Sequence, residues 1–198
     1  MTLDQIIARI RRAMLLDATA YEETRDDATF TLFSLAAAGV GVLLAGIGAW
    51  LYGETVIDSA RPGTGFVDTV ILGSIFTGVL FIIGALAIYL LLGQVFGQEM
   101  SADGLFRIVM LTYLPFGLGL LVFIPEFGFA FGLASVAATF YYTVFGIRAA
   151  YPNTELRQVM LSVLAGFAVW AIVIPFISDY PNDNFVTGVF VYSLFDSF

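Results

Sequence analysis

Five long stretches without a charged side chain dominate this sequence. Each approaches or exceeds the roughly 20 residues that an α-helix needs to cross the hydrocarbon core of a bilayer. Hydrocarbon tolerates few unpaired charges, so stretches of this length are typical of transmembrane helices. The five uncharged stretches are Ala28–Gly53, Thr69–Gln98, Ile108–Pro125, Phe127–Ile147 and Gln158–Ser178.

We therefore expect an all-α integral membrane protein whose core is a five-helix transmembrane bundle. The composition agrees, because 60% of the 198 residues are hydrophobic and 12% are charged. A soluble domain carries about 25% charged residues. The expected helices are Phe30–Leu51, Thr69–Leu92, Leu105–Ile124, Phe127–Phe145 and Leu156–Ile177.

The arginines predict how the chain threads through the membrane. Seven of the eight lie on one side if the N-terminus is cytoplasmic, and Arg61 alone lies on the other side. Cytoplasmic segments carry an excess of basic residues, so we expect a multi-pass protein of the inner (plasma) membrane, oriented N-in and C-out. The seven are Arg9, Arg11, Arg12, Arg25, Arg107, Arg148 and Arg157.

Three regions follow from this threading. Residues 1–27 form a cytoplasmic amphipathic helix and an acidic linker, and residues 28–178 form the transmembrane domain. Residues 179–198 form an extracytoplasmic tail rich in aromatic residues, suited to the outer interface or to a neighbouring subunit. We interpret the acidic stretch Tyr21–Asp27 as a solvated segment, with Thr29 or an aspartate starting the first span.

An amphipathic helix is expected over Leu3–Met14, where apolar residues share one face. Arg9, Arg11 and Arg12 lie beside or opposite this face. Such a helix can lie in the cytoplasmic interface with its arginines reaching anionic headgroups, which is the interpretation we favour. The alternative is a solvated helix docked on the rest of the protein.

Small residues and prolines organise the spans. Ala37, Gly41, Ala45 and Ala49 recur every fourth residue, a spacing that lets another helix approach closely. That helix could belong to the same bundle, which we favour, or to a partner. Pro115 predicts a kink in the third span. Pro125 predicts a short turn to the fourth.

The residue types that are missing remove many chemistries. The chain has no Cys, His or Lys, so it lacks thiolate nucleophiles, the commonest metal ligand and Schiff-base lysines. Its net charge of −8 argues against binding nucleic acid. We expect no cofactor, no metal site and no enzymatic activity. The expected partners are the lipid bilayer and either other membrane proteins or further copies of this chain.

The sequence resembles the Yip1-domain family of small multi-spanning membrane proteins, in its prokaryotic form. The resemblance implies five spans, a cytoplasmic N-terminus and a role in organising membranes. It rests on Arg107–Pro115, Ile124–Pro125, Arg148–Tyr151, Arg12–Asp17 and Tyr21–Glu23.

Three functional hypotheses remain open. The first is a non-catalytic scaffold of the Yip1 type that organises membrane proteins or lipid. The second is a small accessory subunit of a larger membrane complex, for example an energy-transducing one. The third is a small channel or transporter built around the helix break at Pro115, with a path lined by Thr77, Thr112, Tyr113 or Thr139.

Overall fold

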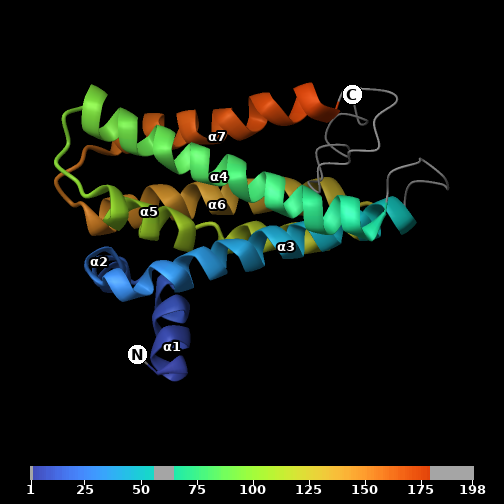
Figure 1. Cartoon of the computed structure of the whole chain (residues 1–198), viewed down its shortest axis with the longest axis horizontal. Coiled ribbons are helices and arrows are strands. Elements are labelled where there is room, and N and C mark those ends of the chain that lie inside the picture. The colour runs from blue at the N-terminus through green and yellow to red at the C-terminus, as the bar shows by residue number, and fades with distance from the viewer. Residues whose placement is uncertain (1, 56–64, 179–198) are drawn as a thin grey trace.

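The computed structural model describes residues 2–55 and 65–178, and all regular secondary structure in these residues is helical (Figure 1). Five helices are long and apolar enough to cross a membrane, which confirms the sequence-based prediction of five spans. Arg61 and the aromatic tail 179–198 lie outside the described residues. The five candidate spans are Ala28–Thr55, Val67–Val95, Ala102–Phe123, Gly128–Ala150 and Leu156–Val173.

Several spans combine α-helix with tighter or wider helical turns. The chain begins with α1 and α2, and the short 3₁₀ helix η1 then leads into the first span. The elements in order are α1 (Leu3–Met14), α2 (Ala18–Asp26), η1 (Ala28–Phe30), α3 (Thr31–Thr55), η2 (Val67–Leu72), α4 (Gly73–Leu90), η3 (Leu91–Val95), α5 (Ala102–Leu111), η4 (Leu114–Phe123), α6 (Gly128–Ala150) and α7 (Leu156–Ser178).

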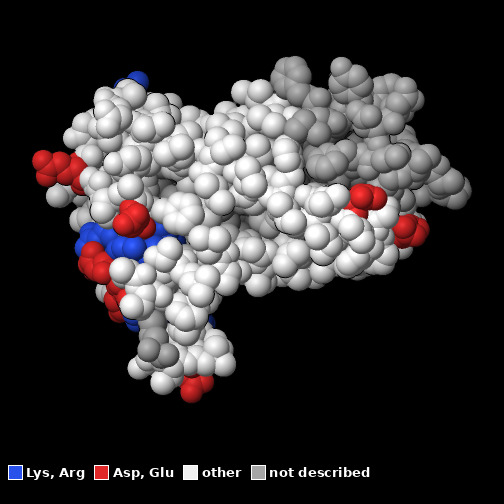
Figure 2. Space-filling model, in the orientation of Figure 1, with Lys and Arg blue, Asp and Glu red and all other residues white. Residues whose placement is uncertain are grey.

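The spans run side by side in alternating directions, and α1 projects away from them beside α2 (Figure 1). We call α1 and α2 the α1–α2 unit, and the end of the bundle beside it the α2 end. Charged side chains gather at the α2 end, acidic ones appear at the far end, and the face between them is uncharged (Figure 2). This distribution is typical of a bundle that crosses hydrocarbon.

Local capping explains where the first two helices begin and end. Thr2 and Gln5 form a reciprocal capping box at the start of α1. Leu16 has a positive φ of 62° after α1. The Asp17 amide donates to Arg12 O and the Leu16 amide donates to Ala13 O, which completes a Schellman motif. The Asp17 side chain then accepts from the Thr19 amide and starts α2.

The third span changes helix type at the predicted proline. The α-helix α5 ends at Leu111, and the ten-residue 3₁₀ helix η4 begins at Leu114 with Pro115 in its first turn. Such long 3₁₀ runs are uncommon. A 3₁₀ helix rises about 2.0 Å per residue, so η4 covers about 20 Å where an α-helix of equal length covers about 15 Å. The change of helix type therefore lets a short span reach across the membrane.

The α3 helix packs most extensively against η4. A Cβ atom at Gly41 would lie 2.5 Å from Tyr113 O and 3.0 Å from Leu114 O, and one at Gly48 would collide with the Gly119 carbonyl. Ala37, Gly41 and Ala45 of the expected stripe are buried here, whereas Ala49 is only half-buried. The stripe thus serves packing within the bundle, and Gly48 rather than Ala49 continues it.

A second close contact joins α4 to α7. A Cβ atom at Gly84 would lie 2.8 Å from the Gly166 carbonyl oxygen. The turns of this second span widen at both ends into the π-helical segments η2 and η3. In the latter, the Phe96 amide donates to Leu91 O at 3.0 Å. Glycine therefore allows a close helix approach at both of these contacts, in keeping with packing in lipid.

Aromatic side chains fill the space between these contacts. The Phe81 ring centroid lies 4.1 Å from that of Tyr113 and 5.0 Å from that of Phe116.

At the far end, Pro125 and Glu126 form a tight turn in which Glu126 has a φ of 70°. The Phe127 amide donates to Ile124 O at 3.3 Å across this turn, which joins the third span to the fourth as an antiparallel hairpin.

Candidate functional site

The densest polar cluster among the described residues joins the α1–α2 unit to the ends of the spans. Arg107, at the start of the third span, is 6% exposed. Its Nε atom donates to Thr24 O at 3.0 Å, and its guanidinium also donates to Arg25 O. These carbonyls belong to the last turn of α2, where helical carbonyls lack intrahelical partners. The cation therefore caps α2 and also meets the negative end of its dipole.

Arg25 of α2 caps another helix in the same way as Arg107 caps α2. Its guanidinium donates to Ala150 O, the carbonyl of the last residue of α6, and pairs with Asp26 at 2.7 Å. The same group lies over the Tyr151 ring, 5.5 Å from the centroid. Arg107 thus ties the third span to α2, and Arg25 ties α2 to the fourth span.

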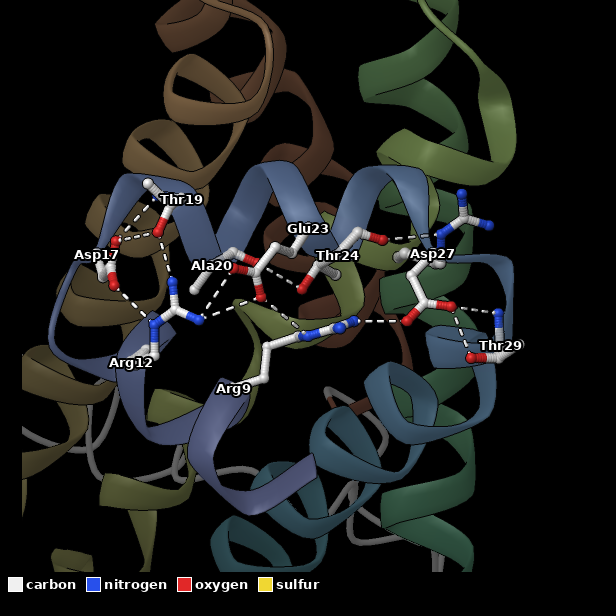
Figure 3. A network of polar contacts seen from close by, with 10 residues as sticks. Arg9, Arg12, Asp17, Thr19, Ala20, Glu23, Thr24, Asp27 and Thr29 are labelled. Carbon is white, nitrogen blue, oxygen red and sulfur yellow. Dashed lines mark hydrogen bonds and ion pairs between the residues drawn. The ribbon is translucent and has the colours of Figure 1, made fainter. Parts of the chain in front are cut away.

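Arg9 and Arg12 face α2 rather than open surroundings (Figure 3). Arg9 pairs with Asp27 at 2.9 Å and lies 4.7 Å from the centroid of the Phe30 ring. Arg12 pairs with Asp17 at 2.8 Å and with Glu23 at 3.0 Å.

The sequence pattern assigned Arg9, Arg11 and Arg12 to lipid headgroups. In the structure, Arg9 and Arg12 form ion pairs with carboxylates of the same chain. These two arginines therefore hold α1 against α2. Arg11 is exposed and makes no ion pair within residues 2–55 and 65–178. Most of the acidic stretch Tyr21–Asp27 forms the last part of helix α2, where its acids are largely exposed, as expected. Glu23 and Asp27 are nevertheless paired with Arg12 and Arg9, and Asp27 accepts from the Thr29 amide at the start of the first span, as predicted.

The ion pairs shift the acidic groups in a consistent direction. Hydrogen bonds from Arg12 and then Thr19 lower the pKa of Asp17 to about 2. The pKa of Asp27 is lowered by hydrogen bonds from Thr29 and then Arg9, and that of Asp26 by its hydrogen bond to Arg25. Each carboxyl group is thus stabilised as an anion in the folded protein.

Two tyrosines fix the end of α1. The Tyr21 hydroxyl is buried and donates to Ala13 O at 2.9 Å. Tyr142 of α6 donates to Met14 O at 2.7 Å. A Cβ atom at Gly146 would meet the Tyr21 ring at 2.8 Å, so glycine is needed there for the ring to fit. The junction of α1 with the bundle is therefore made by buried polar contacts as well as by ion pairs.

The polar residues proposed for a transport path are buried inside the bundle, and among the described residues no hydrogen bond joins two of them to each other. The Thr112 and Thr143 hydroxyls lie 3.0 Å apart, and Thr139 donates to Ser135 O at 2.7 Å. Ser135 donates to Phe116 O at 2.8 Å, at the start of η4. These hydroxyl groups therefore form their hydrogen bonds with backbone carbonyls and with one another within the described spans. Thr77 is also buried, and its hydroxyl has no hydrogen-bond partner among the described residues.

Sequence reasoning missed the capping roles of Arg107 and Arg25. An available signal was the position of Arg107 at the boundary of an apolar stretch, where a cation needs a partner. No group of three His, Cys, Asp or Glu side chains in the described ranges is arranged to hold a metal ion. The cluster can hold helices together, because most of its charged groups form ion pairs or hydrogen bonds between helices.

Comparisons with models of protein families, with curated proteins and with solved structures find no match to this chain. The resemblance to Yip1-domain proteins therefore stays a prediction.

Proposed function

We propose that this chain is a non-catalytic scaffold of the inner (plasma) membrane that organises other membrane proteins or lipid, in the manner implied by its resemblance to Yip1-domain proteins. The observation that carries the proposal is the use of its charged groups. Arg9, Arg12, Arg25 and Arg107 bind carboxylates or carbonyls of the same chain. An α1–α2 unit held by ion pairs and hydrogen bonds, on a bundle closely packed around glycine, is suited to presenting surfaces.

The same arginines support the N-in, C-out orientation. The α2 end holds the start of the first, third and fifth spans and the end of the second and fourth, and seven of the eight arginines lie in these segments or in the α1–α2 unit. Basic residues are retained on the cytoplasmic side. A reporter fused after Phe198 is expected to be active only outside the cytoplasm, and cytoplasmic activity would contradict this orientation.

Native mass spectrometry of the chain extracted from its own membrane tests the scaffold proposal. We expect substoichiometric complexes with other membrane proteins or with a second copy. Substrate-dependent turnover or saturable ion flux by the folded, isolated chain would overturn the proposal, and the segment around Pro115 would become the first place to examine.

The accessory-subunit hypothesis gains support from a groove of about 340 Å³ between α3 and α4. Gly39 and Gly78 line this groove, and a Cβ atom at either would meet nothing within 4 Å. A helix of a larger complex could therefore approach closely here. Gly78→Leu should then abolish a fixed-stoichiometry complex, whereas Gly93→Leu, at an equally open site outside the groove, should preserve it. Equal effects of both variants would contradict a specific interface at the groove.

A further inference from the structure

Three arginines are left over from the cluster at the α2 end. Arg11, Arg148 and Arg157 are exposed, and none forms an ion pair within residues 2–55 and 65–178. A cation that the fold does not use is available to an external anion. The surroundings of the three differ, and only one of them combines an unpaired charge with a hollow free of acidic side chains.

Arg148 stands at the edge of a groove of about 350 Å³ between the end of α6 and the start of α7. The walls are apolar except for Tyr141 and the arginine itself. The Tyr141 and Phe145 rings are stacked with centroids 6.5 Å apart and form one wall. Ala18, the first residue of α2, also lines the groove. The lining residues are Ala18, Tyr141, Val144, Phe145, Arg148, Ala149, Pro152 and Leu156.

The charge around this groove favours an anion. No Asp or Glu lines it. Two acids adjoin lining residues in the chain. Asp17, next to Ala18, is paired with Arg12 at 2.8 Å. Glu155, next to Leu156, is exposed and does not line the groove. The hollow beside Arg11 differs, because the Asp4 carboxylate lines it and would repel an anion. Arg157 lines neither hollow.

The groove also has the polarity profile of a lipid. Arg148 lies two residues before the last residue of α6, near the end of the fourth candidate span. Tyr141 lies seven residues earlier, about 10 Å deeper along the helix axis. A ligand that fits must therefore carry its negative charge at the membrane surface and an apolar chain below it. Basic pockets between transmembrane helices at the cytoplasmic side bind anionic headgroups in this way.

We propose that this groove is a binding site for an anionic phospholipid. The Arg148 guanidinium donates hydrogen bonds to the phosphate, which its planar fork matches. One acyl chain lies against Tyr141, Val144 and Phe145. The site rests on the membrane location given under the proposed function, and it names a lipid that such a scaffold would hold. Since Arg148 makes no ion pair in the described fold, the full strength of the charge is available to the lipid.

Native mass spectrometry of the full chain in detergent tests the site, by titration with phosphatidylglycerol and with phosphatidylcholine of the same acyl chains. We expect phosphatidylglycerol to bind more tightly, and Arg148→Gln to weaken its binding about tenfold, as loss of a charge-assisted contact does. Arg157→Gln is the matched control and should leave binding unchanged. Tyr141→Ser should weaken both lipids, because it removes an apolar wall.

Four results would overturn the proposal. Equal losses in Arg148→Gln and Arg157→Gln would indicate diffuse attraction to the basic surface. Displacement of the lipid by millimolar inorganic phosphate would indicate a site for a soluble anion. Unchanged binding in Arg148→Gln would indicate that the groove does not recognise the charge. Arg148→Lys, which keeps the charge, should retain more phosphatidylglycerol binding than Arg148→Gln, and failure to do so would also count against the site.

This experiment separates the lipid site from the scaffold proposal. Lipid titration in detergent requires only a folded chain, whereas the scaffold proposal concerns complexes with other proteins. Loss of partner proteins with phosphatidylglycerol binding intact would contradict the scaffold alone. If the chain kept its partner proteins but its phosphatidylglycerol binding did not depend on Arg148, the lipid site alone would be contradicted.

Discussion

The interior of the bundle and the α1–α2 unit are held by opposite kinds of contact. In the interior, Gly41 and Gly48 bring the backbones of α3 and η4 together with almost no side chain between them. In the α1–α2 unit, guanidinium groups bridge helices through carbonyls and carboxylates, as Arg107 does to Thr24 O. Lipid supplies no hydrophobic drive between helices, so close packing must join the spans. At the membrane surface, charged groups can be partly solvated and so can serve as connectors.

The largest effect is expected where the two backbones touch. Gly41→Leu places a side chain where even a Cβ atom would lie 2.5 Å from Tyr113 O, so α3 and η4 must separate. We expect a loss of about 3 kcal/mol or more, and little folded protein in the membrane. Abundance and thermal unfolding in detergent measure it. Gly39→Leu is the control on the same helix, with nothing within 4 Å. Equal behaviour of the two variants would mean that the α3–η4 contact is dispensable.

A smaller and more local effect is expected from Arg107→Met. This change removes the cation and leaves the Thr24 and Arg25 carbonyls without their donors. A hydrogen bond to a charged group contributes about 1.5–3 kcal/mol, and bonds made by one guanidinium do not add in full, so we expect a loss of about 2–3 kcal/mol confined to the α1–α2 unit. Hydrogen exchange should rise over residues 18–26 while the spans stay protected. Arg157→Met is the exposed control. Exchange that rises equally in the spans would refute a local role.

The two regions also differ in how far sequence could predict them. The five spans follow from uncharged stretches, and their observed bounds lie within about five residues of the expected ones, because lipid imposes a simple rule on composition and length. The contacts of the α1–α2 unit with the spans could not be predicted from the sequence. Arg107 and Thr24 are 83 positions apart in the chain, and no local pattern marks a guanidinium that binds a distant carbonyl.

Two further features had partial signals. Pro115 predicted a break in the third span, but not the ten-residue 3₁₀ helix that follows. The small-residue stripe predicted a close contact through Gly41, while the neighbour that it meets depends on the tertiary arrangement. The acidic residues Glu22, Glu23 and Asp26 are exposed, as expected from the sequence, but composition alone does not show that Glu23 faces two arginines of another helix.

Acidification should loosen the α1–α2 unit and spare the interior. The pKa of Asp17 is about 2 in the folded protein, below its usual value of 3.8, and those of Asp26 and Asp27 are also lowered. A lowered pKa stabilises the fold above the unfolded value, and the contribution is lost as the pH falls through the folded value. We expect exchange over residues 3–26, corrected for its intrinsic pH dependence, to rise below pH 3.8.

Asp27→Asn provides the control for this pH dependence. It removes one of the titrating groups, so the variant should show a weaker response to acid and a less protected α1 at neutral pH. A unit that becomes more protected on acidification would contradict the ion-pair account.

The smallest effects are expected at two turns, one in the α1–α2 unit and one at the far end of the bundle. Leu16 after α1 and Glu126 at the far end both hold a positive φ that non-glycine residues adopt at a cost of about 1–2 kcal/mol. Glycine removes that strain but adds freedom to the unfolded chain, worth about 0.4–1 kcal/mol. Leu16→Gly and Glu126→Gly should therefore each stabilise by about 0.5–1 kcal/mol, measured as a higher unfolding temperature. Gly97→Ala, at a φ of 65° in open space, should show the opposite sign. If Leu16→Gly destabilised instead, packing of its half-buried side chain would outweigh backbone strain in the α1–α2 unit, and Glu126→Gly would then show whether the far end differs.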